Sequence, residues 1–309
     1  MNILFHCTFS DQAEWLKSLK KKFKGHNFFT IKDKVNYSNI SVAIIWNLPN
    51  NIYKKLVNVR LIFSLGAGVD HIINLPSYNG IPIIRIKDPN MRERMFNHTL
   101  SQILNFQLKL THYQKAQQKK IWLGDSPTPQ NKNLKIGILG LGYLGSFVAK
   151  KLQKLNYQII GYKKTHSKLK LSFKVFTGKK INDFISSSDI IVSILPSTEA
   201  TRDFIDKKFL KKMKKNSLLI NIGRGDSLCE KDLLSHLKIN KNCYVSLDVF
   251  KKEPLSIKHD FWKHPNITIT PHVAAVSDIE SSIDYMHDRF VTFKRKGNIE
   301  SDVNLKKGY

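Results

Sequence analysis

The strongest constraint on the fold is a glycine-rich turn between a short apolar run and an amphipathic stretch. Ile136–Leu139 has the pattern of a strand, Gly140-Leu141-Gly142-Tyr143-Leu144-Gly145 has the spacing G-x-G-x-x-G, and Ser146–Leu155 has helical periodicity. In this context Gly140 permits the tight turn, Gly142 lets the backbone approach a pyrophosphate, and Gly145 lets helix and strand pack closely. Unpaired N–H groups at the helix start would bind the phosphates. The segment predicts a dinucleotide-binding unit; the alternative is a glycine turn that binds nothing.

Apolar runs of strand length alternate with amphipathic stretches of helical length along the chain, which indicates parallel βαβ units. The 309 residues suffice for two domains, at roughly 150 residues each. We therefore predict an α/β protein of two doubly wound parallel-sheet domains, Rossmann-like and flavodoxin-like. Strands are expected at 3–6, 42–46, 61–65, 82–86, 135–139, 157–162, 190–195, 218–222, 244–247 and 267–270, and helices at 11–23, 92–119, 146–155 and 279–296.

The formal net charge of +27 allows two interpretations. A nucleic-acid or membrane partner would explain it, and so would a diffuse, lysine-rich surface. The chain has 43 Lys but only 8 Arg, and the lysines are scattered. Because base readout favours the bidentate Arg side chain, we predict a solvated surface with no nucleic-acid or membrane partner. Tight binding of random DNA that weakens with salt would support the other interpretation.

Other sequence features indicate the compartment. No apolar run reaches transmembrane length, and the first residues have the pattern of a strand rather than a secretion signal. Cys7, Cys229 and Cys243 are odd in number and widely spaced, which suits neither a disulfide framework nor a C-x-x-C pair. We expect a cytoplasmic protein, and no His or Cys spacing indicates a metal site.

The residues after the second strand of the dinucleotide unit bear on the choice of cofactor. An NAD-binding unit usually carries an acid about 20 residues after the glycine turn, where it bonds the ribose 2′-OH. Here Lys163-Lys164-Thr165 follow the strand, and no acid is near. Because an acid would repel a 2′-phosphate whereas Lys163, Lys164 and Thr165 could hold it, we predict NADP(H), with NAD(H) possible. The alternative is that these lysines belong to the general lysine excess.

Three ionisable residues stand in turns after later strands, where open α/β sheets place their ligands. Arg224 lies between two glycines, Glu253 precedes a proline, and His272 follows one. Reducing a 2-oxo acid by hydride requires a proton for the developing alkoxide, which an imidazole can supply near neutral pH. A carboxylate would orient the imidazole and favour its protonated form, and an arginine can grip the substrate carboxylate. Each residue alone could be structural, but together behind a dinucleotide fold they predict a reductase of oxo acids.

The chain resembles the D-isomer-specific 2-hydroxyacid dehydrogenases, and within them the bacterial glyoxylate/hydroxypyruvate reductase A branch. The resemblance covers nearly the whole chain, and its motifs are specific as a set. Besides the glycine turn they are Leu65-Gly66-Ala67-Gly68-Val69-Asp70, Leu195-Pro196-Ser197-Thr198, Asn221-Ile222-Gly223-Arg224-Gly225, Leu247-Asp248-Val249-Phe250, Glu253-Pro254-Leu255, Pro271-His272-Val273-Ala274-Ala275 and the terminal Gly308-Tyr309.

The resemblance implies a role for each matching position. His272 would be the general acid/base, Glu253 its partner and Arg224 the substrate-binding arginine. The backbone N–H groups of Leu65, Gly66, Ala67 and Gly68 would receive the substrate carboxylate, and Asp248 would contact the nicotinamide carboxamide. With the lysines above, the predicted cofactor-binding residues are Gly140, Gly142, Tyr143, Leu144, Gly145, Lys163, Lys164, Thr165, Leu195, Pro196, Ile222 and Asp248.

The resemblance also implies an architecture. Residues 1–97 and 276–309 would form a discontinuous substrate-binding domain, residues 98–275 the dinucleotide-binding domain, and an interdomain cleft would hold the small 2-oxo or 2-hydroxy acid. Trp46 and Met91 match positions near the substrate, although plain core packing would also explain them. Trp122 resembles a tryptophan on an arm that reaches a partner subunit, which implies a homodimer.

Two departures from the family pattern bear on the site. Gly223 stands where the family usually has Ala, which could loosen the turn that carries Arg224. Arg92 stands where close relatives have a small residue, and it could point to solvent or add a cation that favours a more acidic substrate. A different class of protein is also open, a Rossmann-type sensor or corepressor that binds the dinucleotide without turnover. The intact set Arg224, Glu253 and His272 argues against it.

Overall fold

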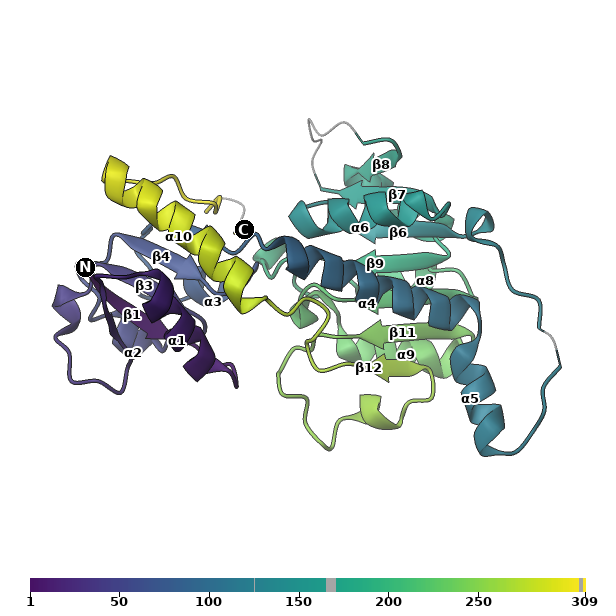
Figure 1. Ribbon diagram of the computed structural model, residues 1–309. Coiled ribbons are helices and arrows are strands. Elements are labelled where there is room, and N and C mark those ends of the chain that lie inside the picture. The colour runs from purple at the N-terminus through teal and green to yellow at the C-terminus, as the bar shows by residue number, and fades with distance from the viewer. Residues whose placement is uncertain (125, 165–170, 306–307) are drawn as a thin grey trace. The chain divides into compact units, whose positions relative to one another are not determined.

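The computed structural model describes residues 1–124, 126–164, 171–305 and 308–309 (Figure 1). The chain divides into two compact units, unit 1 with residues 1–91 and 277–309 and unit 2 with residues 92–276. Each unit is built on a parallel sheet with helices, which confirms the predicted α/β fold class. Within the described residues, no helix is long and apolar enough to cross a membrane. The same residues hold no group of three or more His, Cys, Asp or Glu side chains that could bind a metal ion.

Unit 1 has a five-stranded sheet in the order β2-β1-β3-β4-β5, with every neighbouring pair parallel. This is the flavodoxin-like order, whose switch point lies between the first and third strands. Strands β3 and β4 are buried throughout because the sheet is covered on both faces. The elements are β1 (Asn2–His6), α1 (Gln12–Lys22), β2 (Asn27–Phe29), β3 (Val42–Ile45), α2 (Asn50–Tyr53), β4 (Leu61–Ser64), α3 (Asp70–Ile73), β5 (Ile83–Arg85) and α10 (Ile279–Lys296).

The last helix, α10, belongs to unit 1 and packs on α1 (Figure 1). Its N-cap Asp278 accepts a bond from the Ser281 N–H, and it ends at Gly297, whose φ of 73° suits glycine. Its buried face carries apolar residues at helical spacing. One of these, Phe290, lies with its ring centroid 5.1 Å from that of Phe23, just after α1. Burial of this face therefore holds α10 against the N-terminal segment of unit 1, residues 1–91.

Unit 2 has a seven-stranded parallel sheet in the order β12-β11-β10-β9-β6-β7-β8. Read from β8, this is the 3-2-1-4-5-6 Rossmann order with one further strand, and it reverses between β6 and β9. Helices α4 and α6 pack on one face, and α7, α8 and α9 on the other (Figure 1). The elements are α4 (Pro89–Gln107), α5 (Leu110–Gln118), β6 (Lys135–Leu139), α6 (Tyr143–Lys154), β7 (Gln158–Lys163), β8 (Lys174–Thr177), α7 (Ile181–Ser187), β9 (Ile190–Ser193), α8 (Lys207–Lys212), β10 (Ser217–Asn221), α9 (Glu230–Ile239), β11 (Cys243–Leu247) and β12 (Ile267–Ile269).

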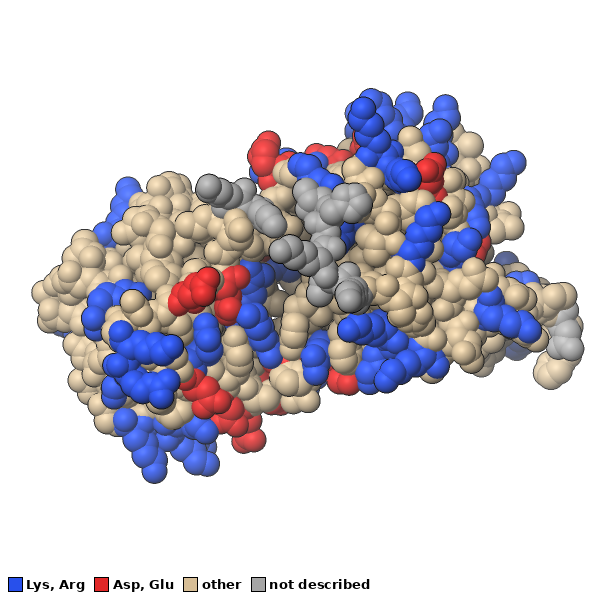
Figure 2. Space-filling view, turned by 90° about the horizontal axis from the view of Figure 1, so that it is seen from above, with Lys and Arg blue, Asp and Glu red and all other residues tan. Residues whose placement is uncertain are grey.

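The structure has elements that the sequence-based predictions did not include, among them the helices α2, α3, α7, α8 and α9. Strands β2 and β8 were not predicted, because both are short sheet-edge strands with few buried positions. The single helix expected over residues 92–119 is two helices, α4 and α5. Lys109 breaks it with a φ of 55°, and neither Gly nor Pro marks the break in the sequence. On the face shown in Figure 2, Lys and Arg side chains lie in several separate groups with acidic side chains among them.

Candidate active site

The glycine turn lies at the switch point of unit 2, between β6 and α6. Gly140 has a φ of 104°, and a Cβ on it would lie 2.6 Å from the Ile194 carbonyl oxygen. A Cβ on Gly145 would lie 1.9 Å from the Gly140 oxygen. Gly142 is different, since a Cβ there would meet nothing within 4 Å. It is also the N-cap of α6 and has no side chain over the first turn, so open space coincides with a helix N-terminus, where phosphates bind.

The other predicted cofactor residues lie at the same carboxyl edge of the sheet. Lys163 ends β7, whose register with β6 sets Tyr162 beside Leu139, and the exposed Lys164 follows. Thr165 lies outside the described residues. Leu195 and Pro196 follow β9, the strand next to β6, and Ile222 follows β10, the strand beyond β9.

Arg224 is held in a turn between two closely packed glycines. A Cβ on Gly223 would lie 2.5 Å from the Leu195 oxygen and 2.6 Å from its nitrogen. A Cβ on Gly225 would lie 1.9 Å from the Phe250 carbonyl carbon. The turn is therefore wedged between the loops after β9 and β11, and only glycine fits on either side of Arg224. At Gly223, where the sequence analysis expected a small change that is harmless or loosens the turn, the structure shows close backbone packing.

His272 and Glu253 form a direct pair. The His272 Nδ1 lies 2.7 Å from the Glu253 Oε2, and Glu253 Oε1 accepts the Phe250 N–H at 2.9 Å. Burial acts to raise the pKa of Glu253, but the bonds from His272 and the Phe250 N–H, with the charges of His272 and Arg224, lower it overall. The carboxylate is therefore ionised at neutral pH. The His272 side chain is 41% exposed, so a ligand can reach it.

The backbone that carries His272 is left-handed and is held by one residue. His272 has a φ of 55°, which is unfavourable for a residue with a Cβ. Its N–H donates to the Asp248 carbonyl at 2.8 Å, and the N–H groups of Val273 and Ala274 donate to the two Asp248 carboxylate oxygens, each at 2.9 Å. Asp248 is 1% exposed. Three consecutive N–H groups thus end on Asp248, and they fix the loop that positions the imidazole.

Two residues behind Asp248 were missed by the sequence analysis. The Thr270 hydroxyl donates to Asp248 Oδ1 at 2.6 Å, and the His98 Nε2 lies 3.1 Å from the Thr270 Oγ1. His98 stands in α4, 172 residues before Thr270. The sequence analysis did not single it out, because no spacing rule connects α4 to the end of β12.

In unit 1, the predicted carboxylate loop Leu65–Gly68 follows β4 at the carboxyl edge. Trp46 follows the neighbouring β3, and a Cβ on Gly66 would lie 2.5 Å from its Cζ3 atom. The ring centroid of His71 lies 4.2 Å from that of Trp46, and its Nε2 lies 3.1 Å from the Ser64 Oγ. Gly66 is therefore required by the indole that covers it.

Met91 and Arg92 stand where α4 enters unit 2. Met91 is 2% exposed, in keeping with core packing. The Arg92 guanidinium carbon lies 4.6 Å from the ring centroid of Phe147 and 5.7 Å from that of Tyr143, both on α6. The Arg92 side chain therefore does not point to solvent, which was one of its two predicted orientations, because its guanidinium stacks on the helix that begins at the glycine turn.

Comparison with known proteins places this architecture in a family. Residues 100–274 match the family described as D-isomer specific 2-hydroxyacid dehydrogenase, NAD binding domain. The glyoxylate/hydroxypyruvate reductase A of Yersinia enterocolitica is 31% identical over 292 residues, 92% of each chain.

Solved structures agree over the full length. The NADPH-dependent glyoxylate/hydroxypyruvate reductase of Sinorhizobium meliloti, in complex with NADP and sulfate, is 28% identical with a TM-score of 0.92, over 100% of this chain and 99% of that one. A probable 2-hydroxyacid dehydrogenase of Rhizobium etli, in complex with NADP, HEPES and L(+)-tartaric acid, is 27% identical with a TM-score of 0.89 over the same shares. The chain therefore belongs to the D-isomer specific 2-hydroxyacid dehydrogenases, a family of NAD(P)-dependent oxidoreductases.

Proposed function

We propose that the protein reduces a small 2-oxo acid to the 2-hydroxy acid with NADPH, and that glyoxylate and hydroxypyruvate are its first candidate substrates. The observation that carries the proposal is the 2.7 Å contact of His272 with Glu253, in the same unit as a glycine turn suited to a diphosphate. The S. meliloti relative is named for this activity and holds NADP. The R. etli relative holds NADP and tartaric acid, a 2-hydroxy acid.

Each polar residue of the site has a distinct part in this proposal. NADPH supplies the hydride when bound. His272 gives a proton to the oxygen of the former carbonyl, through the ring nitrogen that Glu253 does not occupy. Glu253 orients the imidazole by its bond to Nδ1. Arg224 binds the substrate carboxylate and polarises the neighbouring carbonyl.

The two units divide the work in this proposal. Unit 2 is the dinucleotide-binding domain, with the diphosphate on the turn from Gly140 to Gly145. Unit 1 is the substrate-binding domain, where the backbone N–H groups of Leu65–Gly68 receive the carboxylate. Trp46 covers Gly66 in this loop, and we infer that its indole limits the size of the substrate side chain.

The preference for NADPH is proposed to come from Lys163 and Lys164 at the end of β7. Their charges suit a 2′-phosphate, and no acid follows the strand to repel it. Replacing both by Ala should lower the ratio of kcat/KM for NADPH to that for NADH by about tenfold or more, since two charge-assisted bonds are lost. The matched control is the pair Lys211 and Lys212 on α8, whose replacement by Ala should leave the ratio unchanged. A wild-type preference for NADH would contradict this part of the proposal.

The activity is tested by following NADPH absorbance with a panel of 2-oxo acids of increasing size. Wild-type protein should oxidise NADPH with the smallest acids. His272→Asn should lower kcat by about 10²–10⁴ and leave NADPH binding intact. Tight NADPH binding with no turnover of any 2-oxo acid would favour the non-catalytic sensor instead.

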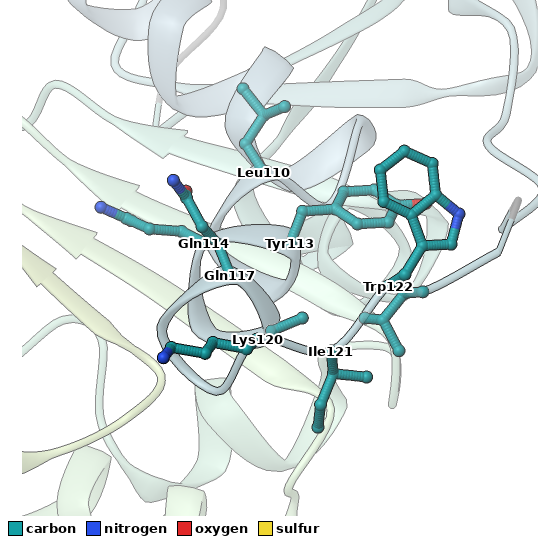
Figure 3. Close-up of a pocket in the computed structure, with 9 residues that line it drawn as sticks. Leu110, Tyr113, Gln114, Gln117, Lys120, Ile121 and Trp122 are labelled. Carbon is teal, nitrogen blue, oxygen red and sulfur yellow. The ribbon is translucent and has the colours of Figure 1, made fainter.

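We also propose that the protein is a homodimer joined through the segment after α5. A cavity of about 680 Å³ lies there, and the adjoining Trp122 is 97% exposed, Ile121 52% and Leu110 50% (Figure 3). Such an exposed apolar patch indicates a covered surface, and the family resemblance suggests a second copy of this chain as its partner. Light scattering should give a dimer mass for wild type and a monomer for Trp122→Ser. A monomeric wild type would contradict the proposal.

A further inference from the structure

The conformation of His272 depends on how one buried carboxylate is oriented. Both oxygens of Asp248 accept backbone N–H groups, Oδ1 from Val273 and Oδ2 from Ala274. The two bonds form together only while the plane of the carboxylate faces the loop. Rotation of the carboxylate would release one of these N–H groups and loosen the loop just after the left-handed His272, whose own N–H donates to the Asp248 carbonyl. A further hydrogen bond to the Asp248 carboxylate would therefore restrict its rotation.

The order of donors in the cluster follows from its chemistry. An ionised carboxylate can only accept hydrogen bonds, so the single hydroxyl proton of Thr270 is given to Asp248 Oδ1 at 2.6 Å. The Thr270 oxygen must then accept from the His98 Nε2 at 3.1 Å. His98 therefore carries its proton on Nε2, and its buried Nδ1, which has no hydrogen-bond partner among the described residues, is the unprotonated nitrogen. Burial supports this neutral form by lowering the pKa of His98, against the opposing charge of Asp248.

We propose that Thr270 and His98 are positioning residues that aim the Asp248 carboxylate and, through it, set the catalytic conformation of His272. The donors run from His98 through Thr270 to Asp248, and the Val273 and Ala274 N–H groups donate to Asp248 from the loop. The His98 side chain is only 12% exposed, so water competes weakly for these bonds. This inference rests on the proposed role of His272 as the proton donor.

Removal of the Thr270 hydroxyl is the direct test. Thr270→Val keeps the shape of the side chain but leaves Asp248 Oδ1 with Val273 alone. We expect kcat to fall by about 10–100-fold, since a displacement of about 1 Å in an active site can cost 10²-fold. The KM for NADPH should change less, because the glycine turn is untouched. Thr270→Ser restores the hydroxyl and should restore most of kcat.

Variants in α4 provide the second test and the control. His98→Gln keeps a donor near the position of Nε2 and should retain most of kcat, whereas His98→Leu should lose it as Thr270→Val does. Thr99→Val is the matched control. Thr99 is fully buried, and among the described residues its hydroxyl bonds only the Met95 carbonyl of its own helix, so kcat should be unchanged.

A second readout separates this inference from the proposed activity. Nitrogen NMR of histidine-labelled protein should show His98 as the neutral Nε2–H tautomer in wild type, and this state should be lost or mixed in Thr270→Val. A wild type that turns over no 2-oxo acid would refute the proposed function. The NMR result would still test the donor and acceptor roles of the hydrogen bonds that join His98, Thr270 and Asp248. Wild-type kcat in Thr270→Val, an equal loss of kcat in Thr99→Val, or an Nδ1–H tautomer of His98 would each overturn the inference.

Discussion

Gly223→Ala tests the close packing that holds Arg224 in place. The added Cβ would lie 2.5 Å from the Leu195 oxygen and 2.6 Å from the Leu195 nitrogen, whereas ordinary contact begins at 3.4 Å. The turn and the loop after β9 must therefore separate by about 0.9 Å, the difference between 2.5 and 3.4 Å. Both partners are backbone atoms, so no side chain can rotate away to relieve the clash.

The separation has two expected costs. Overpacking of this kind typically costs about 1–3 kcal/mol. At about 2–4 °C per kcal/mol for a unit of this size, the unfolding temperature of unit 2 should fall by several degrees. The same displacement moves the Arg224 guanidinium, and a misplacement near 1 Å can lower kcat/KM by about 10²-fold. The loop that moves also carries Pro196, so the KM for NADPH should rise with the KM for the 2-oxo acid.

Calorimetry and steady-state kinetics of the purified variant give both quantities. The control is Gly124→Ala, because a Cβ on Gly124 meets nothing within 4 Å, and that variant should match wild type. A Gly223→Ala protein with wild-type stability and kinetics would refute the reasoning. It would mean that the chain relaxes around an alanine at this position without a measurable cost.

Three further predictions follow from the site. Gly142→Ala should fold normally and weaken NADPH binding in titrations, because its Cβ enters open space. Gly145→Ala should be strongly destabilised, because its Cβ would lie 1.9 Å from a carbonyl oxygen. Equal stability of the two variants would contradict this prediction. Burial lowers the pKa of His98 from 6.5, so the unfolded chain binds a proton at His98 more readily than the folded chain does. The free energy of unfolding that neutral His98 supports is therefore fully present above pH 6.5 and is lost as the pH falls below 6.5. Denaturant unfolding of His98→Gln should accordingly depend less on pH between about 7.5 and 5.5 than wild type does. Arg92→Met should lose about 0.5–2 kcal/mol of stability with its stacking on Phe147 and keep the KM for glyoxylate; a large rise in that KM would show that Arg92 acts on the substrate.

Local sequence patterns predicted most of the sheet. Central strands such as β6 and β10 are buried on both faces, so they are continuous apolar runs that a single sequence reveals. The end of α10 was also visible, because Gly297 follows its last basic turn. The edge strands β2 and β8 were not, since few of their positions are buried, and the break at Lys109 was not, since neither Gly nor Pro marks it.

The sequence by itself determined the dinucleotide turn, because every glycine in G-x-G-x-x-G answers a local demand for a positive φ, an open approach or a tight contact. It also determined which ionisable residues stand at strand ends, since strands of one parallel sheet bring those ends to a common edge. Only the tertiary structure decided how Arg224 is wedged between two loops and why Gly223 must be glycine. It alone brought His98 of α4 to Thr270, 172 residues away, because that contact arises from packing a helix across the sheet and leaves no periodic trace in the chain.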